Sequence, residues 1–127
     1  MIAQVSTPDM CLPIQYALTY PKRVASDRVQ TDLAKIGTLQ FEEPDTDRFP
    51  ALALARRAGE VSGTLPAVFN AANEVAVDAF CEHKLSFLGI TKLVSEVMDQ
   101  HSVRTDPTLE QILEADQWAR NHASSLI

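Results

Sequence analysis

The feature that most constrains the fold is a helical repeat of apolar residues over the C-terminal two thirds of the chain. It is clearest from Leu65 to His83, where apolar side chains recur at i, +3, +4, +7, +11, +14 and +15. The same period follows Asp45 up to Gly63, runs from Ile90 to His101, and starts again at Pro107. Four amphipathic helices on short connections predict a small bundle.

The positions expected to face the core of this bundle can be read directly from the repeat. They are Phe49, Leu52, Ala55, Ala58 and Val61 in the first helix; Leu65, Val68, Phe69, Ala72, Ala76, Ala79 and Phe80 in the second; Ile90, Leu93, Val94, Val97 and Met98 in the third; and Leu109, Ile112, Leu113 and Ala119 in the fourth.

The first 44 residues have a different pattern. Ile2–Ser6 and Thr38–Glu42 alternate as strands do, and a helix is expected between Pro8 and Tyr20, because Pro21 stops it. Lys22–Ile36 shows no period and is interpreted as an ordered linker. The predicted fold is therefore mainly α: a four-helix-bundle-like domain at 45–127, preceded by a short α+β remnant with two strands at 1–44. Such a remnant leaves sheet edges that need a partner.

Charge and cysteine content exclude several classes of protein. The formal net charge is -6 and the pI is near 4.9, so no basic patch would bind nucleic acid. Cys11 and Cys81 are far apart and outside any CxxC motif, which predicts two thiols in a reducing compartment. The N-terminus lacks the features of a signal peptide and no apolar run could cross a bilayer, so the cytoplasm is the expected location, with no membrane partner.

No residue pattern predicts a metal or cofactor site. The chain has four glycines and lacks the GxGxxG, GxxxxGKT and GxSxG motifs. His83, His101 and His122 each fall near a predicted helix C-terminus, where an imidazolium would meet the negative end of the dipole. No two of them have the spacing of a zinc-binding pair, so no metal ligand is assigned.

Polar residues inside the apolar repeat are more unusual. Asn70, Asn73 and Glu74 interrupt the second helix, and Asp116 follows Ile112 and Leu113 on the predicted inner face of the fourth. A buried polar group without a partner costs about 1–3 kcal/mol. We therefore expect these four side chains to form a structural polar network, with Asn73 and Asp116 in contact. Trp118 lies off the stripe and could be a rim residue or cover a neighbouring domain.

Six runs of residues, in the same order, resemble 1-deoxy-D-xylulose 5-phosphate reductoisomerase over essentially the whole chain. The runs are Ala3–Met10, Leu12–Leu18, Leu39–Asp45, Arg48–Pro50, Asn70–Val77 and Ala115–Arg120. The resemblance implies the last part of the catalytic domain, the linker and the C-terminal helical domain of that enzyme family. It departs from the family at Cys11, where Arg is common, and at Ser6 and Ser62, where Gly is common.

The resemblance also implies a function for the intact enzyme. That enzyme rearranges 1-deoxy-D-xylulose 5-phosphate and reduces it with NADPH and a divalent Mg or Mn ion to 2-C-methyl-D-erythritol 4-phosphate, in non-mevalonate isoprenoid biosynthesis. The family enzyme is a homodimer, with NADPH-binding and catalytic domains that precede this region. Pro8 and Met10 match residues at the edge of the substrate and cofactor pocket, and no catalytic residue is carried over.

We therefore expect the chain alone to bind no cofactor and to be inactive. A free-standing helical interaction or dimerisation module is the main alternative, and a small histidine metal protein is a third. Disorder of Ile2–Ser6 and Thr38–Glu42, or their pairing with another copy, would favour part of the enzyme. Strands folded back on the bundle with their edges satisfied would favour the free-standing module.

Overall fold

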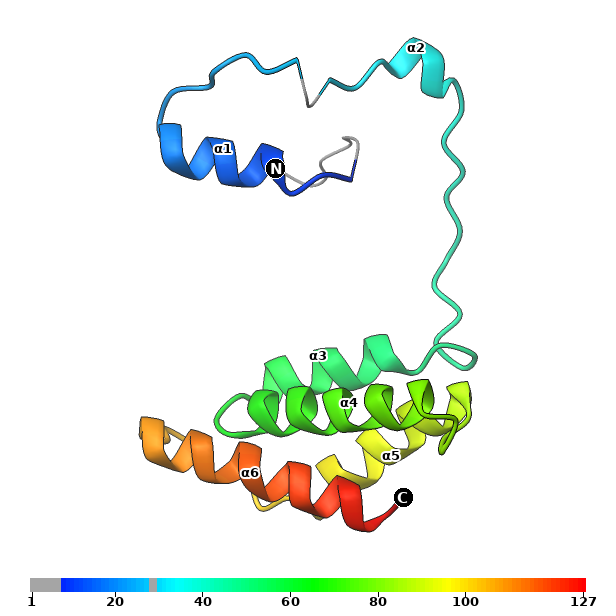
Figure 1. The fold of residues 1–127 in the computed structure, drawn as a ribbon, viewed down its shortest axis with the longest axis vertical. Coiled ribbons are helices and arrows are strands. Elements are labelled where there is room, and N and C mark those ends of the chain that lie inside the picture. Colours follow the sequence, from blue (N-terminus) through cyan, green and yellow to red (C-terminus); the bar gives the residue numbers. More distant parts are fainter. Residues whose placement is uncertain (1–7, 28–29) are drawn as a thin grey trace. The chain divides into compact units, whose positions relative to one another are not determined.

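The computed structural model describes residues 8–27 and 30–127, and the chain divides into two units, residues 1–42 and 43–127. The predicted boundary lay after residue 44. The first unit contains α1 (Cys11–Thr19) and α2 (Leu33–Ile36). The second contains α3 (Ala51–Val61), α4 (Leu65–Cys81), α5 (Phe87–Gln100) and α6 (Leu109–Ser125) (Figure 1). No helix in the described ranges is long and apolar enough to cross a membrane.

Local hydrogen bonds define the two helices of the first unit. The Asp9 carboxylate accepts the amide of Cys11 at 2.7 Å where α1 begins, and α1 ends just before Pro21, as expected. The predicted linker contains α2, whose first amides donate to the carboxylate of Asp32. Every described side chain of this unit is exposed or only partly buried, so no core forms within residues 8–27 and 30–42.

The strand predicted at Thr38–Glu42 is wrong, because these residues have no regular secondary structure and pair with no strand among residues 8–27 and 30–127. Leu39 and Phe41 remain 47% and 86% exposed. A strand requires a second strand to accept and donate its ladder hydrogen bonds, and alternation by itself does not supply one. The other predicted strand, Ile2–Ser6, lies outside the described residues.

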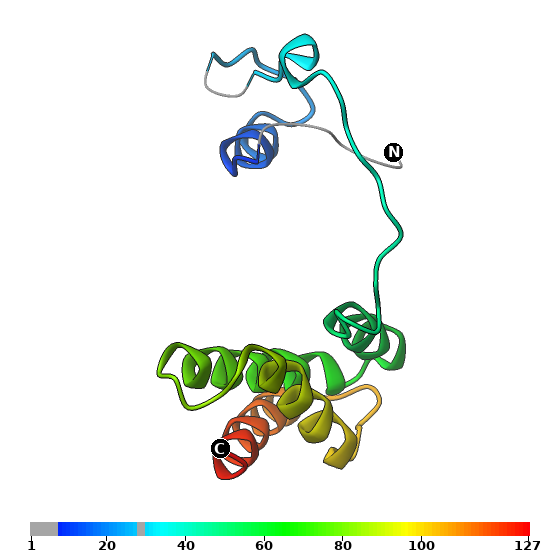
Figure 2. The same cartoon turned by 90° about the vertical axis from the view of Figure 1, so that its right-hand side faces the viewer.

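The second unit is a helical domain built around α4. This helix packs against α3, α5 and α6, and α5 also packs against α6. Figure 1 shows α4 between α3 and α6, and Figure 2 shows α5 inclined to α4. Leu65 and Val68 of α4 and Val97 and Met98 of α5 are almost completely buried. The helical repeat thus correctly predicted the bundle and most of the inner faces of α4 and α5, but Phe80, which was predicted to face the core, is 38% exposed.

The inner faces of α3 and α6 differ from the prediction. Leu109 and Leu113 are 66% and 60% exposed, and the side of α6 that is buried carries Ala115, Ala119 and Ala123. Alanine permits a close approach to α4, whose buried positions are largely alanine too, and a leucine would not fit in that space.

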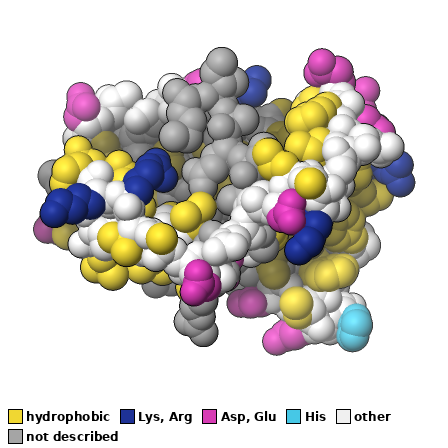
Figure 3. All heavy atoms as spheres, turned by 90° about the horizontal axis from the view of Figure 1, so that it is seen from above, with side chains coloured by type: hydrophobic (Ala, Val, Ile, Leu, Met, Phe, Trp, Pro, Cys, Tyr) yellow, Lys and Arg dark blue, Asp and Glu magenta, His cyan; other side chains and the backbone are white. Residues whose placement is uncertain are grey.

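In α3, only Ala58 of the predicted stripe is buried, and Leu54, one turn earlier on the same face of the helix, packs on the core with it. Phe49, Leu52 and Val61 are about half exposed. Figure 3 draws one face of the chain as spheres and shows exposed hydrophobic side chains interspersed with Lys, Arg, Asp and Glu.

Gly63, in the turn between α3 and α4, has a backbone conformation and a close contact that require glycine. Its φ is +61°, in the left-handed region, and a Cβ atom added there would lie 2.2 Å from the carbonyl oxygen of Arg104. The turn and the loop after α5 therefore approach each other at a distance that only glycine allows.

We predict that Gly63→Ala lowers the free energy of unfolding by about 2 kcal/mol, because the left-handed conformation and the clash both oppose it. Gly59→Ala is the matched control, since nothing lies within 4 Å of a Cβ there and α3 is helical. It should stabilise the domain by up to about 1 kcal/mol. Urea unfolding followed by circular dichroism measures both, and equal effects of the two variants would contradict the assignment.

Candidate functional site

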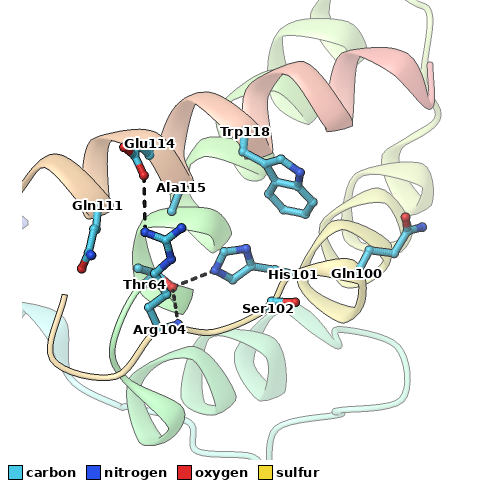
Figure 4. Close-up of a pocket in the computed structure, with 9 residues that line it drawn as sticks. All are labelled: Thr64, Gln100, His101, Ser102, Arg104, Gln111, Glu114, Ala115 and Trp118. Carbon is cyan, nitrogen blue, oxygen red and sulfur yellow. Dashed lines mark hydrogen bonds and ion pairs between the residues drawn. The ribbon is translucent and has the colours of Figure 1, made fainter.

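Three elements meet at the buried hydroxyl of Thr64, at the start of α4 (Figure 4). The amide of Arg104, in the loop after α5, donates to Thr64 Oγ1 at 3.1 Å, and the amide of Thr64 donates to the Arg104 carbonyl at 3.1 Å. His101, which ends α5, has its Nε2 atom 2.7 Å from the same hydroxyl. These bonds tie the α3–α4 turn to the α5–α6 loop.

The contacts of the Thr64 hydroxyl fit one tautomer of His101. The hydroxyl accepts from the Arg104 amide, and the acceptor available to its own proton among residues 8–27 and 30–127 is His101 Nε2. This arrangement corresponds to a neutral imidazole with its proton on Nδ1. Burial, with a smaller contribution from the Arg104 guanidinium, lowers the pKa of His101 and so disfavours the imidazolium expected at this helix end.

Trp118 of α6 lies between two histidine rings. Its ring centroid is 5.1 Å from that of His101 and 5.0 Å from that of His122, and the His122 ring is stacked on it with an interplanar angle of 15°. Trp118 is half-buried and packs on the core, so within this unit it seals the ends of α5 and α6. The Nε2 atom of His122 is buried without a hydrogen-bond partner in the described structure.

A hollow of about 370 Å³ opens beside these residues and is lined by polar side chains. Arg104 and Glu114 face each other across it at 3.4 Å (Figure 4). A threonine hydroxyl beside an imidazole has the composition of a nucleophile and base. The Thr64 side chain, however, has no exposed surface, so no substrate reaches its oxygen. The arrangement joins the α3–α4 turn to the α5–α6 loop.

The predicted polar residues meet through a residue that the sequence analysis did not name, Arg120 of α6. Its guanidinium donates to Asp116 on the same helix at 2.8 and 3.3 Å and to Glu74 of α4 at 2.6 Å. Asn70 donates to the other oxygen of Glu74 at 3.0 Å. Hydrogen bonds from Arg120 and then Asn70 lower the pKa of Glu74, and those to Asp116 and Glu74 raise the pKa of Arg120.

The network is partly exposed and does not include Asn73. Asn70 and Glu74 lie at the surface, and the side chains of Asp116 and Arg120 are about one third exposed. Asn73 lines a groove between α3, α4 and α5, because neighbouring positions of a helix point in different directions. The spacing of Asp116 and Arg120, four residues apart, was the signal that could have identified Arg120.

The remaining candidate residues lie apart from this network. Met10 is 70% exposed and Pro8 is also exposed, both directly before α1. His83 is exposed after the end of α4. Cys11 and Cys81 are exposed and in no disulfide, which agrees with the prediction of two thiols. In the described part of the chain, no three His, Cys, Asp or Glu residues are placed to hold a metal ion.

Together, the fold and the site define a helical accessory domain whose polar groups fasten helices to one another. Comparison with protein families identifies which domain this is. Residues 5–122 match the model of the DXP reductoisomerase C-terminal domain, and the chain belongs to that family.

Relatives and solved structures agree with this assignment. The chain is 55% identical over its whole length to 1-deoxy-D-xylulose 5-phosphate reductoisomerase of Pelotomaculum thermopropionicum and 51% identical to that of Chlorobium chlorochromatii. It spans 33% of each relative. A structure of the Zymomonas mobilis enzyme in complex with NADPH is 42% identical, with a TM-score of 0.87, over 98% of this chain and 33% of that one. A structure of DOX-P reductoisomerase in complex with magnesium has a TM-score of 0.87 at 35% identity, over 98% of this chain and 34% of that one.

We predict that stability of the helical domain falls as the pH drops below about 6.5, the ordinary pKa of histidine. His101 binds its proton less readily when folded, so the unfolded chain takes up more protons. The contribution of His101 is fully present above that pH and is lost as the pH falls through the lower pKa of the folded state.

Chemical unfolding between pH 5 and pH 8 measures this dependence. His101→Gln, which keeps an acceptor for Thr64, should flatten the profile. The control His83→Asn alters an exposed histidine with φ +60°, a conformation that Asn tolerates, and should leave the profile unchanged. A wild-type profile in the His101 variant would contradict the tautomer assignment.

Proposed function

We propose that this chain is the C-terminal part of a 1-deoxy-D-xylulose 5-phosphate reductoisomerase and works only together with the rest of that enzyme. The intact enzyme would convert 1-deoxy-D-xylulose 5-phosphate to 2-C-methyl-D-erythritol 4-phosphate, with NADPH and a divalent metal ion. The single observation that carries the proposal is the family match over residues 5–122, in a chain that spans one third of relatives with that name.

The exposed surface of the first unit supports the same proposal. Leu18, Tyr20 and Phe41 are 83%, 72% and 86% exposed, although residues of these types are normally buried. The extended residues 38–42 likewise have main-chain groups without a neighbouring strand. Both features are expected of a segment that completes its core and its sheet against further protein.

The residues of this chain do not fit the metal that the resemblance implies. An octahedral Mg or Mn site needs several converging oxygen ligands, and the described residues offer no such cluster. Metal and NADPH would therefore be held by other parts of the enzyme.

At the active site of the intact enzyme, Pro8 and Met10 of this chain would contact the substrate and the nicotinamide. Asp9 holds the turn that carries them by accepting the amide of Cys11. The rigid turn would present the exposed Met10 side chain as an apolar, adaptable surface against substrate and nicotinamide. The role of the second unit is to be a self-contained helical scaffold.

We predict that the purified chain does not oxidise NADPH in the presence of 1-deoxy-D-xylulose 5-phosphate and Mg or Mn, because the residues that the structure describes offer no cluster of metal ligands. The Pelotomaculum thermopropionicum enzyme with its matched third replaced by this chain should be active. Both reactions are followed by NADPH absorbance. An inactive but folded grafted enzyme, with the unaltered enzyme active alongside it, would contradict the proposal.

Within the grafted enzyme, Met10→Ala should lower kcat/KM by roughly tenfold. Burying a methionine side chain contributes about 1.5–3 kcal/mol, and 1.4 kcal/mol corresponds to a factor of ten. Lys22→Ala, which alters an exposed charged side chain after the end of α1, is the control and should change kcat/KM less. An equal decrease of kcat/KM in both variants would contradict the proposal that Met10 contacts the substrate and cofactor pocket.

A further inference from the structure

An apolar groove crosses the second unit between α3, α4 and α5. Its volume is about 240 Å³, and its walls include Leu54, Phe69, Val77, Phe87 and Ile90. Phe87 is 63% exposed and stacks edge-on against Phe80, with ring centroids 6.0 Å apart. Phe80 and the neighbouring Leu88 are 38% and 58% exposed, so the apolar surface extends past the groove. Contiguous exposed apolar surface of this kind marks a binding face.

One polar side chain, Asn73, lies in the wall of this groove. Its residue is partly buried, and its amide makes no hydrogen bond to any other part of the chain that the structure describes. An amide offers both donors and an acceptor, which is the combination that pairs with a main-chain peptide group. Thr91, the other polar residue of the wall, already donates its hydroxyl proton to the Leu88 carbonyl at 3.3 Å.

We propose that this groove receives an apolar peptide segment, whose main chain pairs with Asn73, from the two thirds of the reductoisomerase outside these 127 residues. The inference rests on the proposed function. The apolar walls would bury one or two side chains of the segment, and Asn73 would fix its register. This mode of recognition combines apolar anchors with a main-chain hydrogen bond.

Size and connectivity favour this occupant over others. A groove of about 240 Å³ is smaller than the roughly 300–1,000 Å³ of typical small-molecule sites. The relatives are about three times as long as this chain, so an intact enzyme holds further protein covalently tied to the domain. Such a tether gives a high effective concentration, which a second free copy does not have.

The test uses the grafted Pelotomaculum thermopropionicum enzyme with Val77→p-benzoylphenylalanine, a photoreactive residue placed in the groove. Irradiation followed by peptide mass spectrometry identifies what the groove contacts. The expected product links position 77 to a peptide of the upstream two thirds. Phe87→Asp and Asn73→Leu should each reduce its yield at least tenfold. Leu113→Asp adds the same charge at a similarly exposed position of α6 and should preserve the yield.

Three results would overturn the proposal: no cross-link from position 77, a cross-link to the matched 127 residues of another copy, or a yield unaffected by Phe87→Asp and Asn73→Leu. Circular dichroism of each variant shows that the helices are retained. Because cross-linking does not require turnover, an active grafted enzyme without the cross-link contradicts only the groove. An inactive but folded grafted enzyme that still gives the cross-link contradicts only the proposed function.

Discussion

The close packing of α4 against α6 is the constraint on which the rest of the helical domain depends. Both helices bury alanine along their contact, at positions that include Ala72 and Ala76 in α4 and Ala119 and Ala123 in α6. Small side chains let the backbones approach, and the longer groups then lie around the rim. Arg120 can therefore reach from α6 to Glu74, and Trp118 covers the end of α5. A larger residue at this contact would separate all of these pairs.

The polar contacts lie around this packed contact and join elements that are distant in the sequence. At one end, Thr64, His101 and Arg104 close the two loops over the domain. On the α4–α6 rim, Arg120 neutralises two carboxylates that would otherwise repel each other. Ion pairs this exposed contribute little to stability, and their main effect is to fix which faces of the helices meet.

Much of the fold followed from the sequence because helices α4 and α5 have apolar residues at regular helical spacing. The register of α6 was predicted only in part. Ala119 was placed correctly on the inner face, but Leu109 and Leu113 were placed there too, because they carry more apolar surface than the buried Ala115 and Ala123. The prediction of a strand at Thr38–Glu42 failed for a related reason. Alternation of apolar and polar residues within one segment does not show whether a second strand lies beside it. Of the site, Asn70, Glu74 and Asp116 were named, but Arg120, Thr64 and Arg104 were not.

The sequence by itself determined the number and approximate limits of the long helices, the two thiols and the resemblance to a reductoisomerase, because these depend on local periodicity and on residue order. Only the tertiary structure decided which face of α6 is buried, how His101 is protonated, and that Asn73 faces an open groove while Glu74 joins an ion network. Those properties depend on contacts between residues distant in the chain, and such contacts are fixed by volume and geometry rather than by neighbouring residues.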